Sequence, residues 1–106
     1  PPPPPALTAD AATVNRGRDL FNGNCGVCHG LSGVSGGVVP DLRYLTPQKH
    51  AIFPGIVYGA RASRGMPSFA GRLKPEEVDA IHQYLIKRAH DLQDETKAAQ
   101  TAGKAP

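Results

Sequence analysis

A chain of 106 residues with 3 Phe, 3 Tyr and no Trp can form one domain with a modest core, to which a large apolar prosthetic group would add. Its formal charge of +3, from 12 Lys and Arg against 9 Asp and Glu, is too small to indicate a nucleic-acid-binding protein. No apolar run reaches the roughly 18 residues of a membrane-spanning helix.

The chain begins with five prolines, Pro1 to Pro5, and shows neither an initiator Met nor a signal peptide. Consecutive prolines form a stiff, extended segment of about 3.1 Å per residue. We expect this start to be either a disordered terminus or a linker to an upstream domain, and the chain to be a processed piece of a longer protein.

The first helix is predicted over about residues 10–22, with Thr8 or Asp10 as its N-terminal cap. Asn22, Gly23 and Asn24 are expected to end it. Its buried stripe recurs at intervals of three and four residues: Val14, Gly17 and Phe21.

The middle of the chain predicts loops and short helices. Residues 31–39 are rich in Gly and Ser, but they lack the spacing of a phosphate-binding motif, so we expect a loop. A short helix is expected around residues 48–53 and a second near Pro54. Residues 61–71 are expected to form a loop that contains Met66.

The last helix is predicted to begin at Pro75, with Glu76 and Glu77 near the positive end of the helix dipole. Beyond Leu92 the sequence is polar, and residues 93–106 are expected to fray into a flexible tail. No stretch alternates as a strand does, so the fold class is all-α. The apolar stripe of this helix is Val78, Ile81, Leu85, Ala89 and Leu92.

The motif that carries chemistry is Cys25-Gly26-Val27-Cys28-His29, the C-x-x-C-H pattern of c-type haem attachment. Two thiols one helical turn apart can each add to a vinyl group on one edge of the porphyrin, and the adjacent imidazole then lies beneath the iron. The motif therefore predicts one covalent haem c with His29 as an axial ligand.

Other readings of the cysteine pair stay open at this point. Cys25 and Cys28 could form a disulfide, as pairs in secreted proteins do. A thioredoxin-like redox pair would need a βαβ setting, which the sequence lacks. A zinc site would need about four ligands, so two of the four scattered histidines would have to join the pair.

Met66, the only Met, is the predicted sixth ligand of the iron. It stands between Gly65 and Pro67, away from any apolar stripe, so core packing explains it poorly. Thioether ligation opposite a histidine raises the reduction potential and suits electron transfer. The competing ligands are three histidines, of which His50 is the best substitute: His50, His82 and His90.

The chain resembles the class I cytochromes c over roughly residues 8–92. The motifs that carry the resemblance are Gly17-x-x-Leu20-Phe21, Cys25-x-x-Cys28-His29-Gly30, Pro40-Asp41-Leu42, Gly65-Met66-Pro67 and Val78-x-x-Ile81-x-x-Tyr84-Leu85. The resemblance implies N- and C-terminal helices that cross, with Gly17 and Phe21 against Tyr84 and Leu85, and short helices and loops wrapped around one haem. Lys74 departs mildly from the pattern, because Ser or Thr is the commoner cap before the last helix.

The resemblance also implies that the Pro40 carbonyl accepts a hydrogen bond from the ring of His29. Arg43 and Tyr44 follow this loop closely and are candidates for binding a haem propionate. Arg61 and Arg64 flank Met66 and are candidates for steering a partner to the haem edge.

A narrower resemblance is to the C-terminal cytochrome domain of quinohaemoprotein alcohol dehydrogenases, in which a dehydrogenase domain carries pyrroloquinoline quinone (PQQ). It rests on residues 36–44, Ile56-Val57-x-Gly59-Ala60 and residues 65–69. It implies a linker at residues 1–7, a cytochrome c domain at 8–92 and a tail at 93–106.

The expected function is electron transfer through a single haem, from a PQQ dehydrogenase domain of the same parent chain to an external acceptor. The chain alone would not be an enzyme, and covalent haem implies a periplasmic location. A rival reading is a haem-based gas sensor or ligand-binding module, and a weaker rival is a disulfide-bonded protein without haem.

Overall fold

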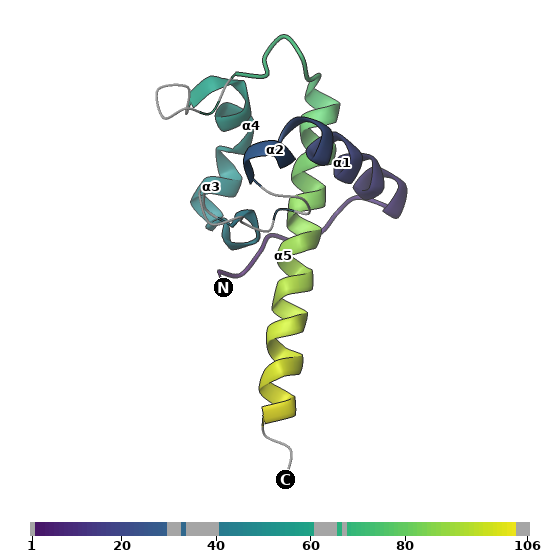
Figure 1. The fold of residues 1–106 in the computed structure, drawn as a ribbon, viewed down its shortest axis with the longest axis vertical. Coiled ribbons are helices and arrows are strands. Elements are labelled where there is room, and N and C mark those ends of the chain that lie inside the picture. Colours follow the sequence, from purple (N-terminus) through teal and green to yellow (C-terminus); the bar gives the residue numbers. More distant parts are fainter. Residues whose placement is uncertain (1, 30–32, 34–40, 61–65, 67, 104–106) are drawn as a thin grey trace.

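Figure 1 shows the computed structural model of the chain, which describes residues 2–29, 33, 41–60, 66 and 68–103, with all of their side chains except those of 27, 28, 60 and 101–103. These parts contain helices and no strand, so the expected all-α class is confirmed. No helix in the described ranges is long and apolar enough to cross a membrane. The elements in chain order are α1 (Ala11–Asn24), α2 (Gly26–His29), η2 (Leu42–Tyr44), α3 (Pro47–Ala51), α4 (Phe53–Gly55), η3 (Ile56–Ala60) and α5 (Pro75–Gly103).

Helix α1 begins at the predicted cap. The carboxylate of Asp10 accepts a hydrogen bond from the backbone N–H of Thr13 at 2.8 Å, which satisfies one of the free donors of the first turn. The helix runs two residues past its expected end, and the side chain of Asn24 donates to the carbonyl of Leu20 at 2.8 Å. The predicted stripe is buried: Val14, Gly17 and Phe21.

Helix α5 begins at Pro75, as predicted, and its cap explains the unusual Lys74. The backbone N–H of Lys74 donates to the carboxylate of Glu77 at 2.9 Å. This is the reciprocal half of a capping box, so the acidic residue three positions on compensates for the missing Ser or Thr. The whole predicted stripe is buried: Val78, Ile81, Leu85, Ala89 and Leu92.

The predicted end of this helix near Leu92 is corrected, because α5 continues to Gly103. Residues 93–102 contain neither Gly nor Pro and are rich in good helix formers. The hydroxyl of Thr96 donates to the carbonyl of Leu92 at 2.9 Å. Figure 1 shows these last turns projecting beyond the other helices. The division into residues 1–7, 8–92 and 93–106 stays a prediction.

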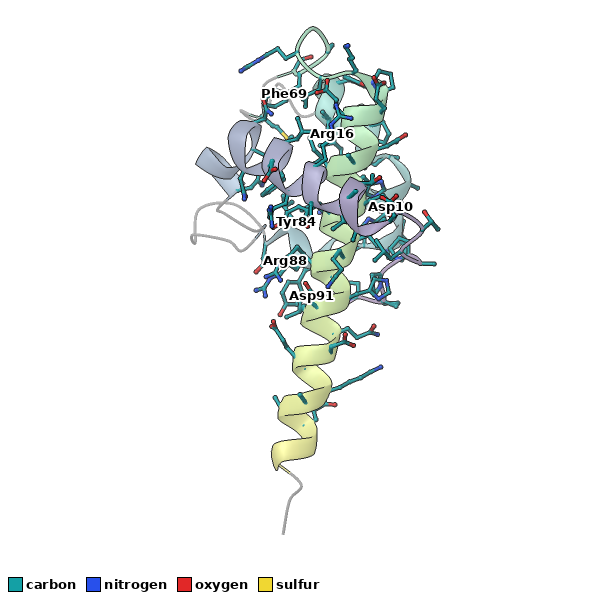
Figure 2. The ribbon with its side chains drawn as sticks, turned by 90° about the vertical axis from the view of Figure 1, so that its right-hand side faces the viewer. Asp10, Arg16, Phe69, Tyr84, Arg88 and Asp91 are labelled. Carbon is teal, nitrogen blue, oxygen red and sulfur yellow. The ribbon has the colours of Figure 1, made fainter. Side chains whose placement is uncertain are left out.

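The two long helices cross where Gly17 faces Ala80. A Cβ atom on Gly17 would lie 1.9 Å from the carbonyl oxygen of Ala80 and 3.0 Å from the Cβ atom of Tyr84, so only glycine allows this approach. Beside it the rings of Phe21 and Tyr84 meet with their centroids 5.8 Å apart. The predicted crossing is confirmed, with Ala80 as an additional contact and Leu85 fully buried in the same cluster. Figure 2 shows α1 lying across α5.

The short helices differ slightly from the prediction. Thr46 caps α3, which ends at Ala51, and the chain then breaks at Ile52 before α4. Pro54 stands in the first turn of α4, where a missing N–H is harmless. Phe53 and Val57 join the main core from these elements.

Replacing Gly17 with Ala should lower the free energy of unfolding by about 1–3 kcal/mol, because the two helices must separate to admit the methyl group. The matched control is Gly23→Ala in the same helix, where a Cβ atom meets nothing within 4 Å. Alanine gives the unfolded backbone less conformational freedom than glycine, so this substitution should raise the free energy of unfolding by about 0.5 kcal/mol. Urea unfolding followed by circular dichroism measures both, and equal effects of the two substitutions would contradict the crossing.

Candidate haem site

The cysteine motif lies at the junction of α1 and α2. The backbone N–H of Cys25 donates to the carbonyl of Phe21 at 2.7 Å, and the N–H of His29 donates to the carbonyl of Cys25 at 2.9 Å. Helical bonding therefore continues through the motif and keeps Cys28 and His29 about one turn beyond Cys25. The Cys25 side chain is 8% exposed and belongs to the main core. An apolar group attached to the Cys25 sulfur would therefore contact the core.

The imidazole of His29 is half-buried at the end of α2, and burial lowers the pKa of His29. A lowered pKa favours the neutral ring, the form that binds a metal ion. Its Nδ1 atom is buried and has no hydrogen-bond partner among the described residues. A buried ring nitrogen of this kind needs a partner. The predicted partner, the Pro40 carbonyl, lies outside the described residues.

Met66 is partly buried, and the chain that follows it is fixed to the short helices. The N–H of Phe69 donates to the carbonyl of Val57 at 2.9 Å, and the hydroxyl of Ser68 donates to the carbonyl of Tyr58 at 3.0 Å. These bonds anchor the C-terminal side of the Met66 loop. Gly65, Pro67, Arg61 and Arg64, on which other expectations rest, lie outside the described residues.

These residues fit a haem c. The observation that tests the fit is the pairing of a buried Cys25 with a buried Nδ1 of His29, one helical turn away, that has no partner in the described part of the chain. A haem attached at Cys25 would extend the core, and a ring whose Nδ1 is held by a carbonyl would present its Nε2 to the iron.

The competing histidines are engaged with the protein. Nδ1 of His50 and Nε2 of His82 are 2.8 Å apart, so one donates to the other. The His82 ring also stacks on Phe53, with centroids 4.5 Å apart. Nε2 of His90 lies 2.8 Å from the carbonyl oxygen of Pro5. His50 alone keeps a buried nitrogen, Nε2, without a partner among the described residues, so it stays the best alternative ligand.

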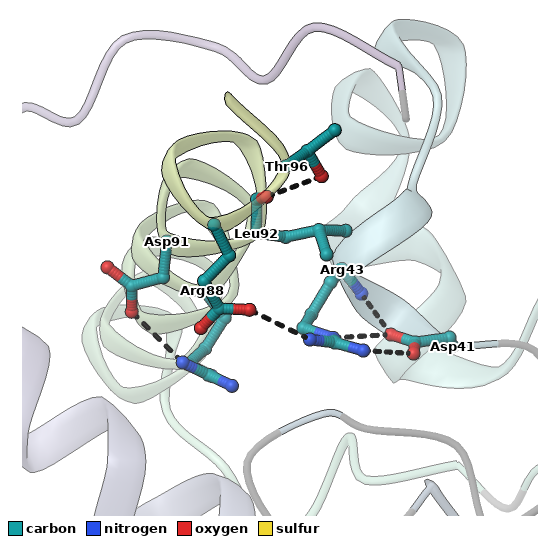
Figure 3. Close-up of polar contacts among 7 residues, drawn as sticks. Asp41, Arg43, Arg88, Asp91, Leu92 and Thr96 are labelled. Atoms are coloured by element: carbon teal, nitrogen blue, oxygen red, sulfur yellow. Dashed lines mark hydrogen bonds and ion pairs between the residues drawn. The ribbon is translucent and has the colours of Figure 1, made fainter. Parts of the chain in front are cut away.

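Arg43 and Tyr44 lie on η2. The guanidinium of Arg43 binds Asp41 through two bonds, Nη2–Oδ2 at 2.8 Å and Nε–Oδ1 at 3.1 Å, and Nη1 lies 4.0 Å from Glu95 of α5 (Figure 3). The hydrogen bond to Asp41 raises the pKa of Arg43. Tyr44 is 47% exposed. Their role toward a propionate stays a prediction, and a propionate would share Arg43 with two carboxylates.

Sequence reasoning missed the Asp41–Arg43–Glu95 link between η2 and α5. The Asp-x-Arg spacing is a weak signal for its first half, since Asp41 also caps η2 by accepting from the N–H of Arg43 at 3.0 Å. The second half joins residues more than fifty positions apart, and no local pattern reveals such a contact.

The family model described as "Cytochrome C oxidase, cbb3-type, subunit III" matches residues 12–85. The chain belongs to this family of c-type cytochromes. As a cytochrome c domain it carries a covalently bound haem c.

This cytochrome domain is 60% identical, over 94 residues, to the quinohemoprotein alcohol dehydrogenase ADH-IIG of Pseudomonas putida, and the match covers 89% of the domain and 13% of that protein. It is 39% identical to the dehydrogenase subunit of the quinone alcohol dehydrogenase of Acetobacter aceti, covering 82% of the domain and 12% of that subunit. The solved structure of ADHIIG from Pseudomonas putida HK5 matches with a TM-score of 0.84 and 59% identity, over 88% of the domain and 14% of that chain. The predicted cytochrome fold is confirmed, and the domain spans about one seventh of these relatives.

The His50–His82 pair predicts a loss of stability in acid. Burial and the neighbouring His50 lower the pKa of His82 to about 4, against the opposing charge of Asp79. An unfolded histidine titrates near about 6.5, so the unfolded chain binds more protons between these values. The contribution of this pair to the free energy of unfolding should therefore be greatest above about pH 6.5. It should fall as the pH drops toward 4.

Urea unfolding of the haem-loaded domain at several pH values measures this slope. His82→Gln keeps a hydrogen-bonding partner for His50 but removes the titrating ring, so its slope should be flatter than that of the unsubstituted domain. Gln48→Ala, an exposed substitution beside His50 on α3, should leave the slope unchanged. An equally steep slope in His82→Gln would contradict the assignment to this pair.

Proposed function

We propose that this cytochrome domain is a single-electron carrier, which accepts electrons from a PQQ-containing dehydrogenase domain and passes them to an external acceptor. The observation that carries the proposal is the α1–α2 junction, where Cys25 is buried and Nδ1 of His29 is buried without a described partner. When bound, the haem supplies a one-electron iron couple.

The residues have separate tasks in this proposal. Cys25 and Cys28 would hold the porphyrin by thioether bonds, so that binding of the iron by His29 would be effectively intramolecular. The Pro40 carbonyl would accept a hydrogen bond from Nδ1 of His29 and so orient the ring. Met66 would hold the iron through its sulfur, which would raise the reduction potential and exclude small ligands. His29 and Met66 are thus the proposed metal ligands.

Arg43 and Tyr44 are proposed to bind the propionates from η2. Arg43 is already held in place by Asp41 at 2.8 Å, which fixes the direction in which its remaining N–H groups point. A guanidinium fixed in this way loses little side-chain entropy when a further carboxylate binds. Tyr44 is exposed enough for its hydroxyl to reach a group at the surface.

The proposed electron donor is inferred from the relatives, which are quinohemoprotein alcohol dehydrogenases. Quinohemoprotein alcohol dehydrogenases are several times longer than the matched region, which covers 13% and 15% of the two Pseudomonas putida proteins. A dehydrogenase in the remaining length of such a parent chain would be the donor, joined through the proline-rich N-terminal segment. The domain alone would then oxidise no alcohol. A periplasmic location of the domain is part of the proposal, because covalent attachment of haem c implies maturation outside the cytoplasm.

The direct test mixes the haem-loaded, oxidised domain with a PQQ-loaded dehydrogenase domain and an alcohol, and follows the optical spectrum. We expect a reduced c-type spectrum that needs both the alcohol and the dehydrogenase. The domain with the alcohol alone should stay oxidised. A haem that stays oxidised in the complete mixture, yet is reduced by ascorbate, would refute this donor.

Met66→Ala should remove the weak near-red band that reports methionine sulfur on ferric iron, lower the reduction potential, and let carbon monoxide bind the reduced protein. The matched control is His50→Gln, which removes the alternative ligand and should keep both the band and the inertness toward carbon monoxide. Absence of the band in the unsubstituted domain, with a spectrum that changes in His50→Gln and not in Met66→Ala, would exchange the two assignments. Prompt carbon monoxide binding by the unsubstituted domain would favour a gas sensor.

A further inference from the structure

The proline-rich N-terminal segment does not point away from the domain. Residues 2–9, which we call the N-terminal strap, run beside α5 from a point near α3 to the start of α1 (Figure 1). The contacts of the strap join residues that are 74 to 85 positions apart in the sequence. Nothing in the proposed electron-transfer site uses them.

The first anchor of the strap is the side-chain amide of Gln83. Its Oε1 accepts from the backbone N–H groups of Thr8 and Ala9, each at 3.2 Å, and its Nε2 donates to the hydroxyl of Thr8 at 3.1 Å. One side chain thus satisfies two backbone donors and a hydroxyl of the strap. Such a set is more specific than a single surface bond.

The second anchor is His90, whose Nε2 lies 2.8 Å from the carbonyl oxygen of Pro5. Because a carbonyl only accepts, Nε2 is the protonated nitrogen in this bond. Gln83 and His90 are seven positions apart, which places them on one face of α5 two turns apart.

The spacing of the two anchors matches the length of an extended segment from Pro5 to Thr8. Seven residues of α-helix rise about 10.5 Å, and the three steps from Pro5 to Thr8 span about 9.3 Å in the polyproline conformation. The strap and α5 run in opposite directions, since Thr8 pairs with Gln83 and Pro5 with His90. Proline also has its φ angle fixed already, so docking costs little backbone entropy.

The prolines of the strap also border an apolar hollow of about 570 Å³. Its other walls come from α3 and α5, including the His50–His82 pair. The strap therefore lies against two elements of the domain instead of a single helix. The residues that line the hollow are Pro3, Pro4, Pro5, Pro47, His50, Ala51 and His82.

We propose that Gln83 and His90 are positioning residues that hold the strap as a fixed arm, so that any upstream domain leaves this cytochrome domain beside α3 in one set direction. The inference rests on the proposed function, because the direction matters only if an upstream dehydrogenase donates the electrons. Electron transfer then occurs within one geometry instead of an average over a free linker.

The first test is hydrogen exchange of the Thr8 and Ala9 amides, followed by NMR in the reduced, haem-loaded 106-residue chain. These amides should be protected, and the double variant Gln83→Leu/His90→Leu should exchange them at least about five-fold faster, because its anchoring bonds to the strap are lost. Gln83→Glu keeps both acceptor bonds and should retain protection. Gln100→Leu, on the exposed end of α5, should change nothing.

The second test uses the same variants in a chain that carries the dehydrogenase. Haem reduction driven by alcohol should slow several-fold in the double variant, whereas reduction by ascorbate should keep its rate, because a small reductant needs no domain orientation. A merely structural role would leave the ratio of the two rates unchanged.

Unprotected Thr8 and Ala9 amides in the unsubstituted chain would overturn the fixed strap. Protection that disappears in the double variant, without slower alcohol-driven reduction, would overturn the positioning role and leave the proposed donor intact. Absence of alcohol-driven reduction in every variant, with the exchange pattern as expected, would refute the proposed donor and keep the docked strap.

Discussion

The close approach of α1 to α5 at Gly17 is the constraint on which the rest of the fold depends. The carbonyl of Ala80 occupies the space that any side chain at position 17 would fill. This contact fixes how far α1 advances across α5, and with it where Phe21 packs and where α1 ends. Since Cys25 follows at the end of α1, the crossing also determines where a haem bound to this thiol would meet the core.

The chemistry of the site divides between elements of different rigidity. Cys25, Cys28 and His29 belong to one continuous helical path, whose backbone bonds at 2.7 and 2.9 Å keep their order and spacing. Met66 lies outside the described helices, and Ser68 and Phe69, which follow it, are hydrogen-bonded to η3. A ligand on a loop is easier to displace than one on a helix, because fewer bonds must open. If Met66 binds the iron as proposed, it would be the ligand that is easier to displace, and His29 would be the more firmly held one.

Sequence reasoning worked best where periodicity was long or a motif was short and specific. The stripes of the two long helices followed from intervals of three and four residues, and the haem followed from five consecutive residues. It failed where a contact bridges distant positions, as between Thr8 and Gln83 or between Arg43 and Glu95. It also ended α5 at Leu92, because apolar spacing stops there although helix propensity does not. The roles of Met66, Pro40, Arg43 and Tyr44 stay predictions.

The overhanging part of α5 has a consequence for how the domain comes apart. Up to Leu92 the helix is held by the core, whereas residues 94, 95 and 97–100 are exposed, and Glu95 is linked to η2 by its 4.0 Å ion pair with Arg43. Local unfolding of the helix should start at the C-terminal end and advance turn by turn until it reaches the buried Leu92. In the next turn toward the N-terminus, Lys87 and Arg88 both bind Asp91, and these ion pairs add to the resistance of the buried part of the helix. A protease that cleaves the projecting end of α5 would thus leave the rest of the domain folded.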